Sequence, residues 1–206
     1  MLACVLPTTF VQTKLLTRLP QWVTDGYSTM LAETSRQISA KTHTSNPRPP
    51  ILALASVGVG SWAQSVVAYY KSLTSNPPSP PNRILTVEPS AAPSFKESLH
   101  RSMLTPTRTG ETIMNGMNCG TTSLNAWPVT RDGVFAAVTV GEREAHREVV
   151  SLKGRGVDAG PCGAATLAAL RSVCEEGLEG LGEEERGDVV VVLFSTEGGR
   201  EYDVPE

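Results

Sequence analysis

Hydrophobic and polar positions follow two different periods along the first third of the chain. Between Trp22 and Ile38, apolar side chains recur every three or four residues, which predicts a helix. The run Ile51–Ala55 is continuously apolar and leads through a glycine turn into a second helical pattern that ends near Leu73. The sequence therefore predicts a helix, a buried strand, a glycine turn and another helix, in that order.

The same two patterns continue toward the C-terminus. Three apolar runs predict strands, and the last of these is expected to be a central strand buried on both faces: Ile84–Glu88, Val134–Val140 and Val189–Phe194. Three further patterns predict helices: one through Phe95 and Leu99, then Glu142–Leu152 and Pro161–Leu178. Strands that alternate with helices predict an α/β fold, with a parallel sheet covered by helices on both faces in three layers.

Four segments lack either period. Three of them are expected to be connectors or a solvated turn: His43–Pro50, Asn76–Pro81 and Glu183–Arg186. The fourth, Thr105–Trp127, is rich in Thr, Gly and Asn and is too long for a simple connection. We interpret it as a candidate functional loop.

The charge balance narrows the class of partner. The chain has 206 residues, a formal net charge of -3 and 19% charged residues, without a basic stripe. Nucleic acid is therefore not expected as a partner. The sequence contains no apolar run long enough to cross a bilayer, so no membrane span is expected either.

Cysteine usage and the N-terminus bear on the compartment. The four cysteines contain no C-x-x-C pair, so the sequence predicts neither a metal site nor a disulfide framework. The segment Met1–Val11 is mildly apolar, lacks a basic leader and is interrupted by Pro7, so we do not interpret it as a signal peptide. These features predict a cytoplasmic protein.

The glycine turn after Ile51–Ala55 has the composition of a phosphate-binding loop. Gly58 and Gly60 allow the backbone to turn sharply and to approach an anion, and the following helix offers free N–H groups with a partial positive charge. A second glycine segment, Gly160–Ala165, opens another predicted helix. In a parallel sheet, both segments could face one bound ligand.

Two interpretations of this turn compete on the residues alone. Gly58–Ala63 satisfies the dinucleotide pattern G-x-G-x-x-A, and the acidic residue Glu88 ends the next strand. Glu88 lies 28 positions beyond Gly60, however, which exceeds the usual spacing of about 20. Glycine turns between a strand and a helix also occur without any ligand.

A series of short motifs extends the comparison beyond the glycine turn. The motifs are Gly26–Met30, Gly58–Ala63, Thr86–Pro89, Thr112–Gly120, Ala126–Pro128, Arg131–Gly133, Glu144–His146 and Gly156–Gly160. In this order, from about Trp22 to Gly198, the sequence resembles the diaminopropionate ammonia-lyase family of pyridoxal-phosphate enzymes, which has fold type II, the tryptophan synthase β-like architecture.

The resemblance implies a role for each candidate residue of the site. The phosphate of pyridoxal 5'-phosphate is implied to lie against the loop residues Ser56, Gly58, Val59, Gly60 and Ser61. Cys162 is implied to face the pyridine nitrogen, where a neutral thiol is a weak partner that does not hold the ring firmly protonated. A small buried residue at a helix start is the alternative interpretation of Cys162.

Two further residues have a softer implied role. Asn118 matches the family's loop near the cofactor and is implied to contact the substrate or the ring, although an asparagine that stabilises a turn is equally consistent with the sequence. Glu88 is implied to orient a group near the cofactor, with a helix or turn cap as the alternative. His100 and His146 are expected on the surface of helices.

The matched motifs correspond to the C-terminal portion of such an enzyme. Residues 1–46 are expected to be a remnant of the small domain with a connecting helix, and residues 47–206 the large domain that forms the cofactor platform. The resemblance places the Schiff-base lysine before the phosphate loop, and this sequence shows no good candidate. We therefore expect an incomplete fold type II architecture that holds pyridoxal phosphate only non-covalently.

The implied activity of the family is β-elimination of 2,3-diaminopropionate to pyruvate and ammonia. A truncated chain without the lysine is expected to be inactive alone, and homo-oligomeric assembly is compatible with the resemblance. One alternative is a non-catalytic scaffold of the same fold that completes a partner chain. A less favoured alternative is an oxidoreductase that binds NAD or FAD through Gly58–Ala63.

Overall fold

The computed structural model describes residues 8–42, 49–73, 81–177 and 189–205, with side chains from Trp22 onward. Most of the predicted connectors His43–Pro50 and Asn76–Pro81, and all of Glu183–Arg186, lie outside the described residues. The elements are α1 (Thr8–Lys41), β1 (Ile51–Ser56), α2 (Ser61–Ser72), β2 (Arg83–Pro89), α3 (Ser94–His100), the 3-10 turn η1 (Asn115–Met117), α4 (Ala126–Gly133), β3 (Ala136–Val140), α5 (Glu142–Lys153), α6 (Pro161–Glu176) and β4 (Val190–Leu193).

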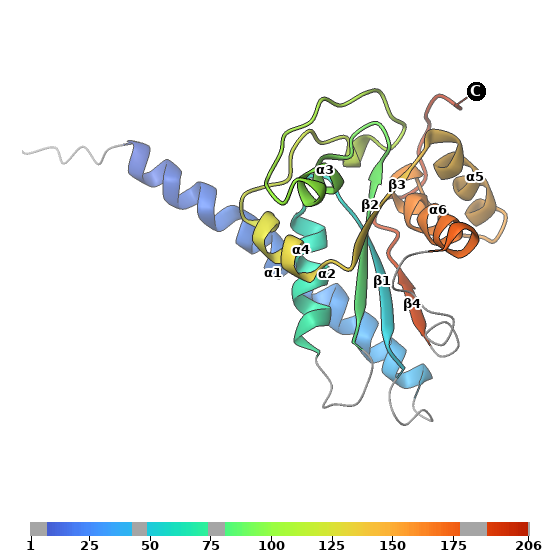
Figure 1. Cartoon of the computed structure of the whole chain (residues 1–206). Coiled ribbons are helices and arrows are strands. Elements are labelled where there is room, and N and C mark those ends of the chain that lie inside the picture. The colour runs from blue at the N-terminus through green and yellow to red at the C-terminus, as the bar shows by residue number, and fades with distance from the viewer. Residues whose placement is uncertain (1–7, 43–48, 74–80, 178–188, 206) are drawn as a thin grey trace, which may run out of the picture.

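The described strands form one parallel sheet in the order β3-β2-β1-β4. Leu54 of β1 pairs in register with Leu85 of β2 on one side and with Leu193 of β4 on the other. Helices cover both faces: α1 and α2 lie on one side of the sheet, and α5 and α6 lie on the other (Figure 1). The predicted three-layer α/β architecture is confirmed.

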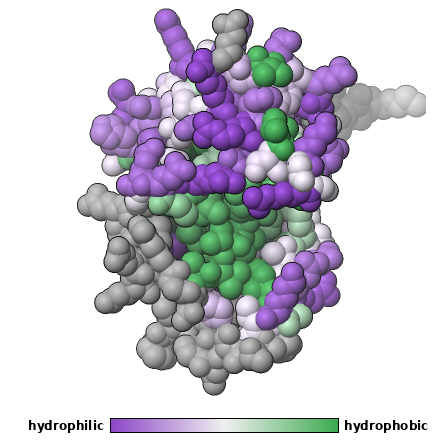
Figure 2. Space-filling view, turned by 90° about the vertical axis from the view of Figure 1, so that its right-hand side faces the viewer, coloured by the Kyte–Doolittle hydropathy of each residue, from purple (hydrophilic) through white to green (hydrophobic). Residues whose placement is uncertain are grey.

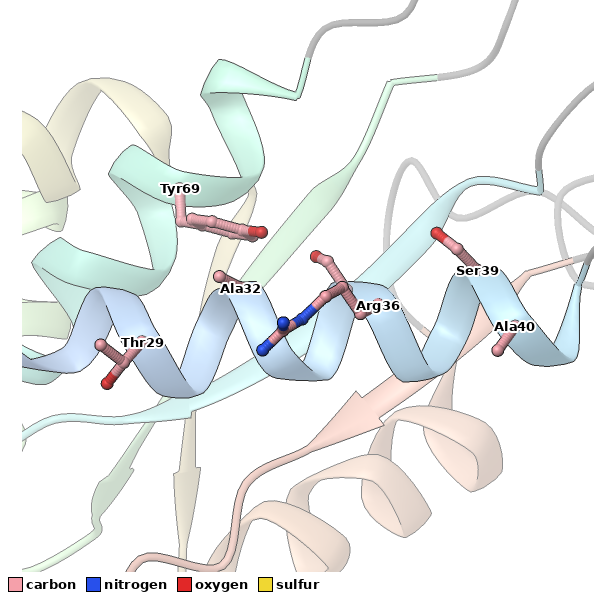
Figure 3. A pocket seen from close by; sticks show the side chains of 7 residues that line it. Thr29, Ala32, Arg36, Ser39, Ala40 and Tyr69 are labelled. Atoms are coloured by element: carbon pink, nitrogen blue, oxygen red, sulfur yellow. The ribbon is translucent and has the colours of Figure 1, made fainter.

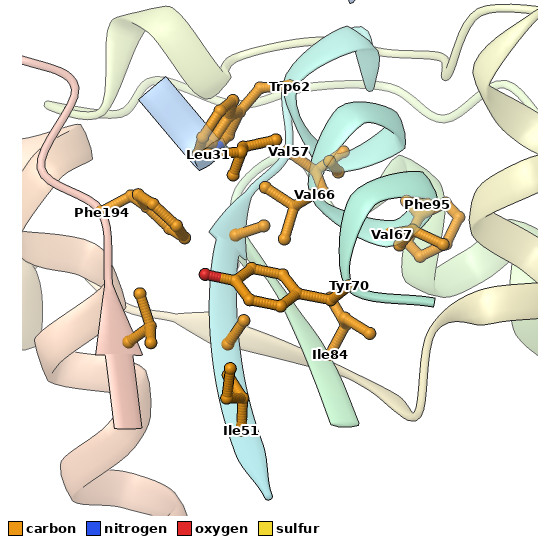
Figure 4. Close-up of a cluster of buried hydrophobic side chains, with 14 of the residues drawn as sticks. Leu31, Ile51, Val57, Trp62, Val66, Val67, Tyr70, Ile84, Phe95 and Phe194 are labelled. Atoms are coloured by element: carbon orange, nitrogen blue, oxygen red, sulfur yellow. The ribbon is translucent and has the colours of Figure 1, made fainter. Parts of the chain in front are cut away.

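Each face of the sheet has its own apolar core. Because successive side chains of a strand point to opposite faces, Ala53 and Ala55 pack toward α1 and α2, whereas Leu52 and Leu54 pack toward α6. In the core next to α2, Trp62 forms edge-to-face ring contacts with Tyr27 and Phe194, at 4.9 Å between ring centroids in each case. Figure 4 shows Trp62 and Phe194 in this core. This ring cluster joins α1, α2 and the segment after β4.

The prediction of a central strand at Val189–Phe194 was wrong about its position. β4 occupies an edge of the described sheet, and Val191 retains 39% exposure. An apolar run indicates that a strand packs against other elements, but it does not state how many neighbouring strands flank it. Figure 2 shows that apolar surface gathers in one area on the side of the molecule that carries α5 and α6.

The first helix is longer than its apolar pattern predicted. The pattern indicated Trp22–Ile38, whereas α1 begins at Thr8 and continues through Pro20, a residue that ordinarily marks a helix start. The C-terminal part of α1 packs on α2 through the buried Leu31, while its N-terminal part projects beyond the sheet (Figure 1). The proposed domain boundary at residue 46 stays a prediction.

Candidate functional site

The carboxyl ends of the four strands meet at one edge of the sheet. β2 and β3 lie on one side of β1, and β4 lies on the other, so the chain connections diverge between β1 and β4. In open parallel sheets, ligands bind at this point of divergence, outside the carboxyl ends of the strands. The glycine turn that follows β1 and the segment that follows β4 both lie there, as does the start of α6 against that segment.

The turn between β1 and α2 requires glycine at two positions. Gly60 has a φ of 96°, and a Cβ atom there would lie 2.9 Å from the Cβ of Ala126 and 3.0 Å from the Cγ2 of Thr122. A Cβ atom at Gly58 would lie 2.7 Å from the carbonyl oxygen of Gly116. The backbone of this turn therefore packs directly against η1 and α4.

The turn presents unused hydrogen-bond donors. Val57 N–H donates to Val87 O, and Gln64 N–H donates to Gly60 O. Between them, the N–H groups of residues 58–63 donate no hydrogen bond to any other described residue. A helix start with free N–H groups binds anions, so the geometry fits a phosphate.

The two serines of the loop flank these donors. Ser56 ends β1 and Ser61 begins α2, and both are partly exposed. The side chain of Val59 is 53% exposed, while its carbonyl oxygen accepts a hydrogen bond from Ser123 N–H at 2.9 Å. That bond anchors the turn to the segment before α4, so the loop is held in place without the use of its own N–H groups.

Cys162 lies near the glycine turn through η1. Its side chain is buried, and its sulfur lies 3.4 Å from the position of a Cβ atom on Gly116, the residue whose carbonyl oxygen faces Gly58. Burial, reinforced by the negative charge of Glu197, raises the pKa of the Cys162 thiol to about 11. The group is therefore a neutral thiol at physiological pH.

The N-terminus of α6 is already occupied by a carboxylate. Cys162 N–H donates to Glu197 Oε2 at 2.6 Å, and Gly160 N–H donates to Glu197 O at 3.0 Å. The sequence allowed both glycine segments to face one bound ligand, and in the structure the Cys162 N–H of the α6 start is engaged by Glu197, whereas the first N–H groups of α2 have no partner among the described residues. Residues 58–61 therefore fit an anion better than the start of α6 does.

Asn118 stabilises its own loop with one half of its amide. Its Nδ2 donates to Gly110 O at 3.1 Å, which supports the turn-stabilising interpretation. Its Oδ1 is buried and has no hydrogen-bond partner among the described residues. The amide oxygen thus remains the part of Asn118 that a ligand contact would use.

Glu88 caps a helix from the end of a strand. Its carboxylate accepts hydrogen bonds from Phe95 N–H at 2.7 Å and Lys96 N–H at 2.8 Å, at the start of α3. The side chain is 1% exposed, and burial raises its pKa to about 7. A carboxylate engaged in this way is not available to a ribose hydroxyl, which removes the acidic residue that a dinucleotide site requires.

Replacement of Glu88 by glutamine is expected to flatten the pH dependence of the unfolding free energy. The carboxyl has a pKa of about 7 in the folded chain against a reference of 4.5, so the associated stability is complete below pH 4.5 and is lost as the pH rises through 7. The loss amounts to about 3 kcal/mol. Denaturant titrations between the reference pKa of 4.5 and the folded pKa of about 7 measure this loss of unfolding free energy. Glu97→Gln is the control on the same helix. If the unfolding free energy changes equally with pH in wild type and in Glu88→Gln, the raised pKa of Glu88 is contradicted.

The described lysine side chains lie away from the glycine turn. Lys41, Lys71 and Lys153 occupy the last turns of α1, α2 and α5, and all are exposed. Lys96 is exposed on α3, where its Nζ lies 3.4 Å from Thr139 Oγ1. None of these groups has a described contact with residues 58–61.

Two surface cavities lie elsewhere on the molecule. One, of about 640 Å³, lies between α1 and α2 and is lined by Thr29, Arg36 and Tyr69 among others (Figure 3). The other, of about 990 Å³, lies between α5 and the C-terminal segment, where His146 Nδ1 and Tyr202 OH are 2.9 Å apart. The residues that line these two cavities include no helix start with free N–H groups, so the candidate site stays at the sheet edge.

Two residues near Cys162, Glu197 and Arg200, had no signal in the sequence analysis. Gly116, which also lies near Cys162, belongs to the motif Thr112–Gly120. The one available signal was position, because Ser195–Gly199 directly follows a strand at the carboxyl edge of the sheet. Among the described residues, no cluster of three His, Cys, Asp or Glu side chains could hold a metal ion. None of the described helices is long and apolar enough to span a membrane.

Known proteins share both sequence and fold with this chain. A family model described as pyridoxal-phosphate dependent enzyme matches residues 15–196. The curated diaminopropionate ammonia-lyase of Salmonella typhimurium (strain LT2) is 31% identical over 147 residues, which cover 69% of this chain and 33% of that protein.

Solved structures extend the similarity over more of the chain. The Escherichia coli diaminopropionate ammonia lyase, in complex with an aminoacrylate-PLP azomethine reaction intermediate, superposes with a TM-score of 0.71 at 24% identity, covering 88% of this chain and 46% of that chain. The threonine deaminase from T.th. gives a TM-score of 0.60 at 25% identity, and the match covers 75% of this chain and 50% of that chain. The chain thus spans between 33% and 50% of the length of these relatives. Since the family model covers most of its residues, the chain belongs to the family of pyridoxal-phosphate dependent enzymes.

Proposed function

We propose that this chain forms the cofactor platform of a diaminopropionate ammonia-lyase-like enzyme and binds pyridoxal 5'-phosphate through the turn at residues 58–61. The observation that supports this most strongly is the set of free N–H groups from Gly58 to Ala63 at the divergence of the sheet. A doubly or singly ionised phosphate satisfies these donors and the positive end of α2 together.

The residues around the turn fit the rest of the cofactor. The neutral, buried Cys162 suits a pyridine ring nitrogen, and the unpartnered Oδ1 of Asn118 suits a polar substituent. When bound, pyridoxal phosphate supplies an electron sink for elimination at the β-carbon of an amino acid. The protein residues hold the phosphate, exclude water from the ring edge at Cys162 and fix the ring in register.

The substrate class follows from the relatives. The curated relative is named as a diaminopropionate ammonia-lyase, and we extend that activity to the complete enzyme of which this sequence forms the platform. The expected reaction is conversion of 2,3-diaminopropionate to pyruvate and ammonia in the cytoplasm. A small amino acid is therefore the expected substrate.

The 206-residue polypeptide by itself is proposed to bind the cofactor without a covalent bond and to lack lyase activity. The support is the position of Lys41, Lys71, Lys96 and Lys153, whose described side chains are exposed and make no contact with the turn. A group that must both bond to the cofactor and move a proton has to lie within hydrogen-bond reach of it.

A binding titration tests this proposal. Pyridoxine 5'-phosphate, which lacks the aldehyde, is expected to bind with a single saturable site, and pyridoxal without the phosphate is expected to bind at least tenfold more weakly. Isothermal titration calorimetry measures both ligands. After addition of pyridoxal phosphate, borohydride reduction and peptide mass spectrometry are expected to show no single modified lysine.

Two results contradict parts of the proposal separately. A stoichiometric, borohydride-fixed cofactor on one lysine refutes the non-covalent binding mode while the platform stands. Retention of NAD with no response to either phosphate ligand refutes the platform itself. Addition of 2,3-diaminopropionate with pyridoxal phosphate, followed by pyruvate detection, tests the expected inactivity of the chain.

A non-catalytic role within an assembly is the second candidate function. The apolar area in Figure 2 and the exposed Val191 on edge strand β4 favour it, because exposed apolar patches beside a sheet edge commonly pack against another polypeptide. Sedimentation equilibrium distinguishes a monomer from a self-associated form of the chain. A monomer at micromolar concentration argues against self-assembly through this area.

A further inference from the structure

The 3-10 turn η1 lies against the glycine turn without a hydrogen bond between their backbones. A Cβ atom at Gly58 would lie 2.7 Å from the carbonyl oxygen of Gly116 and 3.6 Å from the Cα of Met117, so the two backbones are in direct contact. Among the described residues, no backbone-to-backbone hydrogen bond joins η1 to residues 57–61. The position of η1 on the glycine turn therefore depends on how η1 is anchored elsewhere.

Ile113, two residues before η1, is held on both sides of its backbone by charged side chains. Its N–H donates to Glu142 Oε2 at 2.6 Å, and its carbonyl oxygen accepts a hydrogen bond from the guanidinium of Arg200. Glu142 is the first residue of α5, and Arg200 lies in the segment after β4. Hydrogen bonds to charged groups are roughly twice as strong as neutral ones. Two distant parts of the chain thus hold one residue next to η1.

The segment that carries Arg200 is itself fixed against α5. Arg200 Nε lies 2.9 Å from Glu197 Oε1, which orients the guanidinium. Tyr202 OH lies 2.9 Å from His146 Nδ1. His146 is four residues after Glu142, so both side chains lie on the same face of α5. The C-terminal segment therefore docks on the helix face that carries Glu142.

On the basis of the proposed cofactor site, we propose that Glu142 and Arg200 form one clamp on Ile113 and are positioning residues that keep η1 in contact with the phosphate-binding turn. When either hydrogen bond is lost, the backbone at Ile113 rotates and the other bond weakens with it. η1 then moves away from the glycine turn, and residues 58–61 lose the packing that fixes the direction of their N–H donors. Both side chains act through η1 and not by contact with the ligand.

Alkylation of Cys119 in the ligand-free chain measures how firmly η1 is held. The sulfur of Cys119 lies 3.3 Å from the position of a Cβ atom on Gly58, and burial raises the pKa of this thiol. With iodoacetamide at mildly alkaline pH, Glu142→Ala and Arg200→Ala are each expected to react about fivefold faster than wild type, because release of η1 exposes the thiol. Peptide mass spectrometry follows Cys119 separately from the other cysteines.

The double variant Glu142→Ala/Arg200→Ala distinguishes one clamp from two separate supports. Because either break releases η1, the double variant is expected to react about as fast as each single variant. Two independent structural effects, one on α5 and one on the C-terminal segment, predict instead that the two factors multiply to about 25-fold. A multiplied rate in the double variant, or a wild-type rate in the single variants, overturns the inference.

Two matched variants loosen the same elements without a change at Ile113. Glu144→Ala removes the acceptor of the hydrogen bond from Gly141 N–H at the start of α5, and Tyr202→Phe removes the hydrogen bond to His146. Both variants are expected to keep the wild-type alkylation rate of the thiol. If they react as fast as the alanine variants of the clamp, loosening of the elements explains the effect and the clamp is refuted.

Conservative variants keep the test valid where an alanine variant fails to fold. Glu142→Gln retains an oxygen that accepts from Ile113 N–H, and Arg200→Lys retains a charged donor. Both are expected to react at rates between those of wild type and the alanine variants, since a neutral or single donor holds the residue less firmly. If Glu142→Gln reacts as fast as Glu142→Ala, the hydrogen bond to Ile113 does not hold η1, and the inference fails.

Ligand binding tests the link to the cofactor site. Glu142→Ala is expected to bind pyridoxine 5'-phosphate about fivefold more weakly than wild type in calorimetric titrations, whereas Glu144→Ala is expected to bind it with wild-type affinity. Unchanged affinity of Glu142→Ala, beside saturable binding by wild type, overturns the inference and leaves the proposed function intact. Absence of binding by wild type refutes the proposed function, whereas the alkylation rates still report on the clamp.

Discussion

Replacement of Gly58 by alanine is expected to weaken binding of pyridoxal phosphate by at least tenfold. The added methyl group would lie 2.7 Å from the carbonyl oxygen of Gly116 and 3.3 Å from the sulfur of Cys119, so the turn and η1 must move apart. That movement displaces the N–H donors of the turn and, through Gly116, the contact with Cys162. The same strain is expected to lower the unfolding free energy by about 1–3 kcal/mol.

Calorimetric titration of the folded variant measures the affinity, and two other glycines provide controls. Gly26 lies in α1, where an added Cβ atom would have no other atom within 4 Å, so Gly26→Ala is expected to stabilise the chain by about 0.5–1 kcal/mol without a change in affinity. At Gly133, a Cβ atom would overlap Cγ1 of Val67, between α4 and α2. If Gly133→Ala weakens binding as much as Gly58→Ala does, affinity follows global stability and the assigned turn is wrong.

Truncation of Trp62 to alanine is expected to lower the unfolding free energy by about 3–5 kcal/mol. The indole packs between Tyr27 of α1 and Phe194 after β4, so its removal leaves a cavity where three segments meet (Figure 4). Because Trp62 also belongs to the first turn of α2, the loss of packing is expected to loosen the helix start whose N–H groups are proposed to bind the phosphate.

Trp62→Phe is the matched variant for this prediction. The indole Nε1 is buried and has no hydrogen-bond partner among the described residues, so phenylalanine removes an unsatisfied donor while it keeps most of the ring packing. Urea denaturation followed by circular dichroism is expected to show a loss of less than about 1.5 kcal/mol for this variant. A similar loss for alanine and phenylalanine contradicts the role assigned to the ring cluster.

Most of the element order was predictable because most elements carry their own period, although the short helix α4 (Ala126–Gly133) was not predicted. The continuous run at β1, the helical spacing of α2 and the small residues of α6 were all identified from the sequence, within a few residues of the observed bounds. The edge position of β4 was not predictable, because an apolar run is the same whether one strand or two flank it. The extension of α1 to Thr8 was also missed, because the apolar spacing indicated a helix only over Trp22–Ile38.

The candidate site also contains parts that the sequence predicted and parts that it did not. The glycine turn was recognisable because its donors and its conformational demand are both local to residues 58–61. The role of Glu88 was open between a ligand contact and a cap, and the hydrogen bonds to Phe95 and Lys96 identify it as a cap of α3. Glu197 and Arg200 had no local pattern that distinguished them from other charged residues near the C-terminus.

By itself, the sequence determined the alternation of strands and helices, the glycine turn and the family resemblance, because these depend on residues close together in the chain. Only the tertiary structure decided that the start of α6 is occupied and the start of α2 is free. Glu197 reaches Cys162 across 35 positions, and Arg200 reaches Ile113 across 87. Contacts of that separation depend on the strand order and on the close approach of backbones, and neither is written in any local period.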